Sequence, residues 1–152
     1  MPVAEFERVN REREAAGEEL YANPRNVTAG AIRQLASRQV ASRRLAAVVY
    51  QIAEGPPFAT HADSLERLAE WGFPVHESWR RCRGLAEVEE FIAQWREKRH
   101  TLGFETDGVV VKVDRFDQQA RLGMVTRAPR WTIAFKFPPE QVETLVEDIV
   151  AY

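Results

Sequence analysis

The segment from residue 131 to residue 137 constrains the fold more than any other, because side-chain size alternates strictly along it. In a strand, successive side chains point to opposite faces. Four large residues then share the face that should pack on a core: Trp131, Ile133, Phe135 and Phe137. Three residues share the other face: Thr132, Ala134 and Lys136. This second face leaves room for a flat or anionic ligand with Lys136 as its phosphate contact, and the alternative is an exposed lysine on an edge strand.

A second strand is predicted from Gly108 to Asp114, and it also carries a lysine. Its valines at 109, 111 and 113 point one way, whereas Gly108, Val110 and Lys112 point the other. A lysine on a half-buried sheet face is costly unless it meets an anion or a hydrogen-bond acceptor. Asp107, directly before the strand, is a candidate partner or metal ligand, although about 15 Å of extended chain separates its side chain from that of Lys112.

Apolar residues recur at helical spacing over three longer segments. The first runs from Pro2 to Ala16. The second follows a Thr60 cap and ends before Gly72, and its apolar stripe consists of Leu65, Leu68 and Trp71. The third runs from about residue 85 to residue 99. Five of its apolar residues are expected to face the core: Leu85, Val88, Phe91, Ile92 and Trp95.

Two shorter helices and three further strands complete the expected secondary structure. The helices cover residues 27–35, with Asn26 or Thr28 near the cap, and about residues 116–122. The strands cover residues 45–52, 74–79 and 142–151, and the first is apolar enough to be buried. Helices and strands without regular βαβ spacing favour an α+β fold with antiparallel sheets flanked by helices.

The composition is that of one globular domain, with 152 residues of which 45% are hydrophobic and 29% are charged. Cys82 is the only cysteine, so no disulfide framework is expected and a reducing, cytoplasmic setting fits best. No apolar run approaches the roughly 18 residues of a membrane span, and the first residues lack an apolar signal region. We therefore expect a folded soluble chain without a membrane partner.

Positive charge is concentrated in two segments, although the net charge is −2. Residues 21–53 contain no acid, and their +5 comes from five arginines: Arg25, Arg33, Arg38, Arg43 and Arg44. Residues 118–139 also contain no acid, and their +4 comes from four residues: Arg121, Arg127, Arg130 and Lys136. This segregation indicates a cationic surface for phosphates, and the alternative is a set of ordinary solvated arginines.

The first basic segment has the features of a phosphate clamp. Arg25 precedes an expected helix and Arg33 lies about two turns inside it. The N–H groups at a helix N-terminus and the forked guanidinium group of arginine both match phosphate oxygens. The segment therefore predicts a clamp formed by the two arginines.

Three groups of residues, taken in order, resemble the nucleotidyltransferase domain of bacterial NAD-dependent DNA ligases. The first is Tyr-Ala-Asn-Pro-Arg-Asn at 21–26, with Gly30 and Arg33. The second is Leu-Gly-Phe at 102–104 with Asp-Gly-Val-Val-Val-Lys-Val at 107–113. The third is Ala-Pro-Arg-Trp at 128–131 with Ala-Phe-Lys-Phe-Pro at 134–138. The resemblance covers nearly the whole chain and is to the NAD-dependent branch, not to ATP-dependent ligases or capping enzymes.

The resemblance implies a covalent nucleotidyltransferase domain related to ATP-grasp folds, and a three-step reaction on nicked double-stranded DNA. In that reaction a lysine takes AMP from NAD, the AMP passes to a 5′-phosphate, and the 3′-hydroxyl displaces it. Mg²⁺ assists each transfer, and the remaining ligase domains are the implied partners.

By match of motif, Lys112 and Lys136 would contact the adenylate, and Asp107 would hold metal or the attacking group. Tyr50 would stack on adenine, with a core aromatic in the buried strand as its alternative interpretation. Three arginines would stabilise phosphate charge or grip the nicked DNA: Arg25, Arg33 and Arg99.

The chain also departs from the family pattern, because it contains neither Lys-x-Asp-Gly nor the Arg-Gly-Glu strand that precedes the Met-Pro segment in the family. We therefore expect Met1 to be an internal methionine and residues 1–152 to be a partial adenylation domain without a second domain. We also expect the chain alone not to adenylylate itself. The alternatives are a non-catalytic module that binds an adenine nucleotide or a nucleic-acid end, and a plain α+β domain whose arginines serve solubility.

Overall fold

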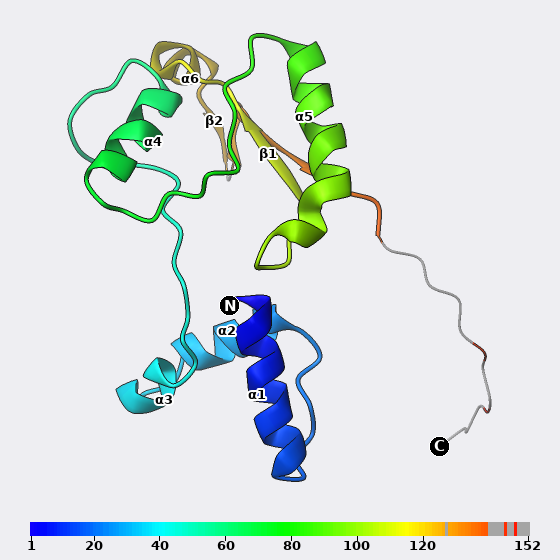
Figure 1. Ribbon diagram of the computed structural model, residues 1–152. Helices are drawn as coiled ribbons and strands as arrows, with labels where there is room; N and C mark the ends of the chain where they lie inside the picture. Colours follow the sequence, from blue (N-terminus) through cyan, green and yellow to red (C-terminus); the bar gives the residue numbers. More distant parts are fainter. Residues whose placement is uncertain (127, 140–144, 146–147, 149–152) are drawn as a thin grey trace.

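The computed structural model describes residues 1–126, 128–139, 145 and 148, and it has a mixed α+β architecture (Figure 1). The helices described are α1 (Val3–Ala15), α2 (Pro24–Ile32), α3 (Ser37–Ala41), α4 (His61–Glu70), α5 (Leu85–Lys98), the 3-10 helix η1 (Arg99–Thr101) and α6 (Phe116–Leu122). The strands described are β1 (Gly108–Lys112), β2 (Met124–Val125), β3 (Ala128–Pro129) and β4 (Thr132–Lys136). No helix in this part of the chain is both long and apolar enough to cross a membrane.

The helix α2 begins where local chemistry favours a helix start. The Asn23 side chain accepts a hydrogen bond from the Asn26 N–H at 2.9 Å, which satisfies one of the free donors at a helix N-terminus. Pro24 occupies the first helical position, where its missing N–H costs nothing. The helix start predicted from the sequence is three residues too late, because Asn26 or Thr28 was expected near the cap.

A small core joins the first two helices. Val9 of α1 is fully buried, and Val27 and Ala31 of α2 are buried as well. The N–H of Val3 donates to the Gly103 carbonyl at 2.9 Å, so α1 is attached to the segment that leads into β1. This hydrogen bond attaches the N-terminal part of the chain, which contains α1 and α2, to the segment next to the sheet.

A second small core belongs to α4, whose predicted cap is confirmed. The Thr60 hydroxyl oxygen accepts from the Asp63 N–H at 3.1 Å, and Gly72 follows the helix with a φ of +82°, a conformation that favours glycine. Three apolar residues of this helix are buried: Ala62, Leu65 and Leu68.

The strands β1 and β4 form an antiparallel two-stranded sheet. Its register pairs Gly108 with Lys136, Val110 with Ala134, and Lys112 with Thr132. Residues directly opposite each other in a sheet share a face, so both lysines lie on the same face. The helix α5 contacts β1, and the short β2–β3 pair forms a separate antiparallel sheet.

The prediction of a buried strand over residues 45–52 is wrong. These residues belong to no strand, and Val48 and Tyr50 are 48% and 66% exposed. The Val49 N–H donates to the Pro74 carbonyl at 2.9 Å, but a strand requires a ladder of such bonds along a partner. The segment 74–79, predicted as a strand, likewise forms none.

The predicted core faces are also less buried than expected. Ile133 and Phe135 of β4 are 68% and 39% exposed, because a two-stranded sheet has few neighbours to cover it. Trp71 and Leu85, expected on core-facing stripes, are also exposed. Phe137 is the buried member of the predicted apolar face.

The other expected elements are present with shifted ends. The first helix, α5 and α6 lie within one or two residues of their predicted bounds, and β1 and β4 are each shorter than predicted. The mixed α+β architecture with antiparallel sheets is confirmed at this level. The strand expected over residues 142–151 lies outside the described residues.

Gly108 is the position where β1 tolerates no side chain. A Cβ added there would lie 2.3 Å from the Phe135 carbonyl oxygen, so Gly108→Ala must displace the paired strand. We expect a loss of about 1–3 kcal/mol in the free energy of unfolding, measured by urea denaturation.

The matched control is Gly30→Ala, because a Cβ at Gly30 meets nothing within 4 Å. Gly30 lies inside α2, where alanine is favoured over glycine by about 0.5–1 kcal/mol. The two substitutions should therefore change stability with opposite signs. Equal effects would contradict the β1–β4 register.

Candidate functional site

Lys112, the last residue of β1, lies beside a histidine and a tyrosine ring. Its Nζ lies 3.4 Å from His61 Nε2 and 5.0 Å from the centroid of the Tyr50 ring. The side chain is half-buried, and burial lowers the pKa of its ammonium group. Among the described residues, no carboxylate forms an ion pair with Lys112, so this partly desolvated cation has a neutral ring and an aromatic face as neighbours.

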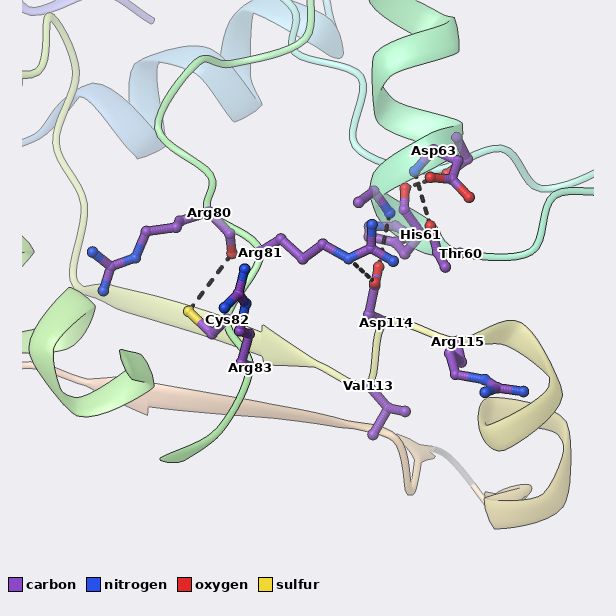
Figure 2. Close-up of polar contacts among 12 residues, drawn as sticks. Thr60, His61, Asp63, Arg80, Arg81, Cys82, Arg83, Val113, Asp114 and Arg115 are labelled. Carbon is purple, nitrogen blue, oxygen red and sulfur yellow. Dashed lines mark hydrogen bonds and ion pairs between the residues drawn. The ribbon is translucent and has the colours of Figure 1, made fainter. Parts of the chain in front are cut away.

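Asp114 holds the elements around this cluster together. Its carboxylate accepts from the Ala62 N–H at 2.9 Å and forms an ion pair with Arg81, whose Nε lies 2.7 Å from Asp114 Oδ2. Its backbone carbonyl accepts from the His61 N–H at 2.7 Å. Figure 2 shows this carboxylate between the Arg81 guanidinium group and the first turn of α4. The end of β1, the start of α4 and the segment before α5 therefore meet at one side chain.

His61 is the first residue of α4, so the start of this helix determines where its ring lies. Its ring makes an edge contact with Phe116, with centroids 6.1 Å apart, and faces Lys112 on another side. Burial lowers the pKa of His61, the positive charge of Lys112 lowers it further, and Asp114 opposes both. The ring is therefore biased toward the neutral form, which can accept a hydrogen bond from a lysine ammonium group.

The second lysine, Lys136, pairs with Asp107 across the sheet end. Its Nζ lies 3.0 Å from Asp107 Oδ2, and both side chains are exposed, at 74% and 80%. The hydrogen bond and charge of Lys136 lower the pKa of the Asp107 carboxyl, and Arg25 contributes in the same direction. An ion pair this exposed contributes little stability, so a ligand can replace either partner at low cost.

The structure brings some of the predicted site residues together and separates others. Arg25 lies in the first turn of α2 and acts electrostatically on Asp107. Arg33 is the C-cap of the same helix, so it is not two turns inside a longer helix as predicted. The two arginines are about 12 Å apart along the helix axis, and only Arg25 lies at the helix N-terminus.

Arg99 lies away from the lysine face. Its guanidinium carbon is 5.5 Å from the centroid of the Phe137 ring. By the alternation of side chains along β4, Phe137 points away from the face that carries Lys136. The predicted contact of Arg99 with phosphate or nicked DNA stays a prediction.

A cavity of about 910 Å³ lies beside β1. Lys112, Tyr50 and His61 line one part of it, and apolar residues of α5 such as Phe91 and Trp95 line another. The cavity is large enough for a nucleotide-sized ligand, and Lys112 is one of the cationic residues that line it, together with arginines such as Arg80 and Arg83.

A magnesium site was expected at Asp107. Among the described residues, no group of three or more His, Cys, Asp or Glu side chains has the spacing of a metal site. Magnesium is commonly held by one or two carboxylates together with substrate phosphates and water. Asp107 fits such a shared site, because its carboxylate is exposed and ionised beside Lys136.

Three residues of this cluster were not predicted from the sequence: His61, Asp114 and Arg81. Two signals were available in the sequence. His61 directly follows the Thr60 cap, and Asp114 lies two positions after Lys112, so its side chain is expected on the same side of the strand. Neither signal shows that His61 is a partner of Lys112, because more than fifty residues separate the two in the sequence.

Comparison with known proteins identifies the chain's relatives. The family described as "NAD-dependent DNA ligase adenylation domain" matches residues 1–140. The DNA ligase of Geobacter sulfurreducens is 49% identical over 152 residues, which cover 99% of this chain and 23% of the relative. The DNA ligases of Gloeobacter violaceus and Thermotoga neapolitana are 50% and 47% identical over 98% of this chain, and 22% of each relative is covered. The chain thus spans less than a quarter of the length of these relatives.

The charges around His61 predict opposite effects of two substitutions on its pKa. Lys112→Met removes a positive charge that lowers the pKa, so the pKa should rise. Asp114→Asn removes a negative charge that raises it, so the pKa should fall while the amide oxygen still accepts from α4. Titration of the His61 ring protons by NMR measures both shifts.

Lys98→Met is the control, because Lys98 lies in the last turn of α5 and is not among the groups that shift the pKa of His61. It should leave that pKa unchanged. Shifts of the same sign for Lys112→Met and Asp114→Asn would contradict the described cluster.

Proposed function

Because the chain belongs to the family of NAD-dependent DNA ligase adenylation domains, we propose that it supplies part of the nucleotide-binding site of such a ligase. The observation that carries this proposal is the β1–β4 register, which puts Lys112 and Lys136 on one sheet face. Between them the face carries small or apolar residues: Gly108, Val110, Thr132 and Ala134. A surface of this kind suits a nucleotide, whose phosphate would meet the lysines.

In this proposal, residues 1–152 form one partial covalent nucleotidyltransferase domain of the ATP-grasp-like type, with antiparallel sheets flanked by helices and no second domain. The 152 residues contain no Lys-x-Asp-Gly, so the lysine that accepts AMP is proposed to lie elsewhere in the ligase. The ligase would seal nicks in double-stranded DNA through an enzyme-adenylate and a DNA-adenylate. NAD would be the source of AMP.

The chain's own residues would bind and orient the nucleotide. Lys112 is held partly out of water, where a phosphate would offset the cost of desolvating its ammonium group. Lys136 is exposed and would exchange Asp107 for a phosphate oxygen. Tyr50 offers an exposed ring beside Lys112 for stacking on adenine.

Asp107 is proposed to hold Mg²⁺ or to orient the attacking group. A magnesium ion bound there would neutralise developing charge on the phosphate. Release of Lys136 to the nucleotide would leave the Asp107 carboxylate free to act as a ligand, and its lowered pKa keeps it ionised.

Nicked DNA and the other ligase domains are the proposed partners. Arg25, near Asp107, is placed to contact a phosphate close to the nucleotide. Arg33 lies at the far end of α2, and we assign it to a neighbouring phosphate of the DNA backbone. Arg99 is assigned to the same DNA-gripping role.

The second candidate is a non-catalytic module that binds an adenine nucleotide or a nucleic-acid end. It would need a cationic face, but it would not need Asp107 beside Lys136 at the same end of the sheet. The presence of this carboxylate therefore favours the ligase proposal. The two candidates differ in whether loss of the lysines abolishes AMP transfer or only weakens binding.

The chain's three lysines provide the test of this proposal. In a ligase polypeptide that contains these residues, Lys112→Ala and Lys136→Ala should each slow AMP transfer from NAD by about a hundredfold or more, as expected for a lost charge-assisted contact to phosphate. Single-turnover incorporation of labelled AMP measures the rate.

Lys98→Ala is the matched control, because this lysine lies on α5 and not on the sheet. It should leave the rate of AMP transfer near that of the parent. If all three variants transferred AMP at the same rate, the lysine face would not be the nucleotide site.

The arginines give a separate prediction about DNA. Arg25→Ala and Arg33→Ala should each slow nick sealing by about two powers of ten while lowering stability little. Arg25→Lys should restore little of the loss, because lysine keeps the charge but not the planar fork.

Arg43→Ala is the control within the same basic segment, since Arg43 lies after α3 and in none of the three motif groups. It should alter the salt dependence of DNA binding slightly and leave the sealing rate intact. Equal sealing rates for the Arg25, Arg33 and Arg43 variants would mean that the basic segment is a solvated surface.

A further inference from the structure

The position of His61 indicates a role that goes beyond charge and sheet register. Its Nε2 lies 3.4 Å from the Lys112 ammonium group, and the Tyr50 ring lies beside the same group, with its centroid 5.0 Å away. The flexible four-carbon side chain of a lysine populates several rotamers unless such contacts restrain it.

We propose that neutral His61 is the positioning residue for Lys112, with its Nε2 accepting a hydrogen bond from the Lys112 ammonium group. This inference rests on the proposed function of Lys112 as a phosphate contact. The proton of the neutral ring is then on Nδ1, and the ammonium group is held on the sheet face before the nucleotide arrives.

The surroundings of His61 suit this role. His61 is the first residue of α4, and its ring is restrained by the edge contact with Phe116. The start of α4 is fixed to Asp114 through the N–H groups of His61 and Ala62. Lys112 and Asp114 are the charged groups that act on the ring, and Arg81 neutralises part of the Asp114 charge.

A pH dependence follows from the same geometry. Burial and Lys112 lower the pKa of His61, so the ring is neutral and able to accept at neutral pH. When acid protonates the ring, Nε2 becomes a donor beside a second cation, and the contact with Lys112 is lost. The positioning effect is therefore present at neutral pH and disappears as the pH falls through the pKa of His61.

The first test uses the 152-residue chain without nucleotide. Long-range ¹H–¹⁵N NMR at pH 7.5 should show an unprotonated Nε2 and a protonated Nδ1 on His61. Lys112→Met should shift the Nε2 resonance, whereas Lys136→Met, at the other end of the same sheet face, should leave it unchanged. An unprotonated Nδ1, or a Nε2 resonance insensitive to Lys112→Met, would overturn the proposal.

The second test uses a ligase polypeptide that contains the chain, with NAD as the probe. His61→Leu should slow AMP transfer by about ten- to a hundredfold, the usual consequence of a misplaced reacting group. His61→Gln, which keeps an acceptor but cannot titrate, should restore most of the rate at pH 7.5 and remove the acidic limb of the pH profile. His100→Gln is the control, because His100 lies in η1 and is not among the residues that line the cavity, and it should change neither.

Urea denaturation of each variant separates positioning from folding. A His61→Leu variant that is stable and transfers AMP at the parent rate would overturn the inference, as would a His61→Gln variant as slow as His61→Leu. If Lys112→Ala is inactive in either of these cases, the proposed function stands and the positioning role alone fails. If Lys112→Ala is fully active, both fail.

Discussion

The candidate site depends first on the contacts of one carboxylate, that of Asp114. It accepts a hydrogen bond from the Ala62 N–H at the start of α4, at 2.9 Å, and forms an ion pair with Arg81, at 2.7 Å. A carboxylate at a helix N-terminus is favoured by the helix dipole, and the arginine reduces the cost of its partial burial. Because His61 begins α4, these contacts also place its ring beside Lys112. The geometry of the lysine thus depends on a residue outside the motif groups.

The two lysines share a sheet face but have different surroundings. Lys112 is half-buried among Tyr50, His61 and the valines of β1, and burial lowers the pKa of its ammonium group. Lys136 is exposed and pairs with Asp107. The first is held in a fixed direction with part of its hydration already removed, whereas the second is free to change partner. Lys112 would hold a nucleotide on this face in one position, whereas Lys136 could move its charge to follow the phosphate.

Local signals in the sequence predicted four of the helices close to their observed bounds, whereas α2 was placed three residues too late and α3 was not predicted. Tertiary pairing accounts for the errors in the strands. The Thr60 cap and the run of residues 116–122 involve neighbours within a turn or two, so α4 and α6 were predicted close to their observed bounds. Strand parity placed Lys112 on a face with Val110, and Lys136 on a face with Ala134, but only the register shows that these faces are one. The strand over 45–52 failed because apolar content does not specify a partner strand. His61 was missed because a lone histidine at a helix start has no chemical signature of its own.

The exposed Asp107–Lys136 pair also couples anion and cation binding. While the pair is intact, the ammonium group lowers the pKa of the Asp107 carboxyl and occupies one of its oxygens. An anion that draws Lys136 away frees that oxygen and removes the nearest positive charge, so the carboxylate becomes a better ligand for a cation. By reciprocity, a cation at Asp107 releases Lys136 and favours the anion. A phosphate and a magnesium ion would therefore bind with positive cooperativity at this end of the sheet, although the pair itself contributes little to stability.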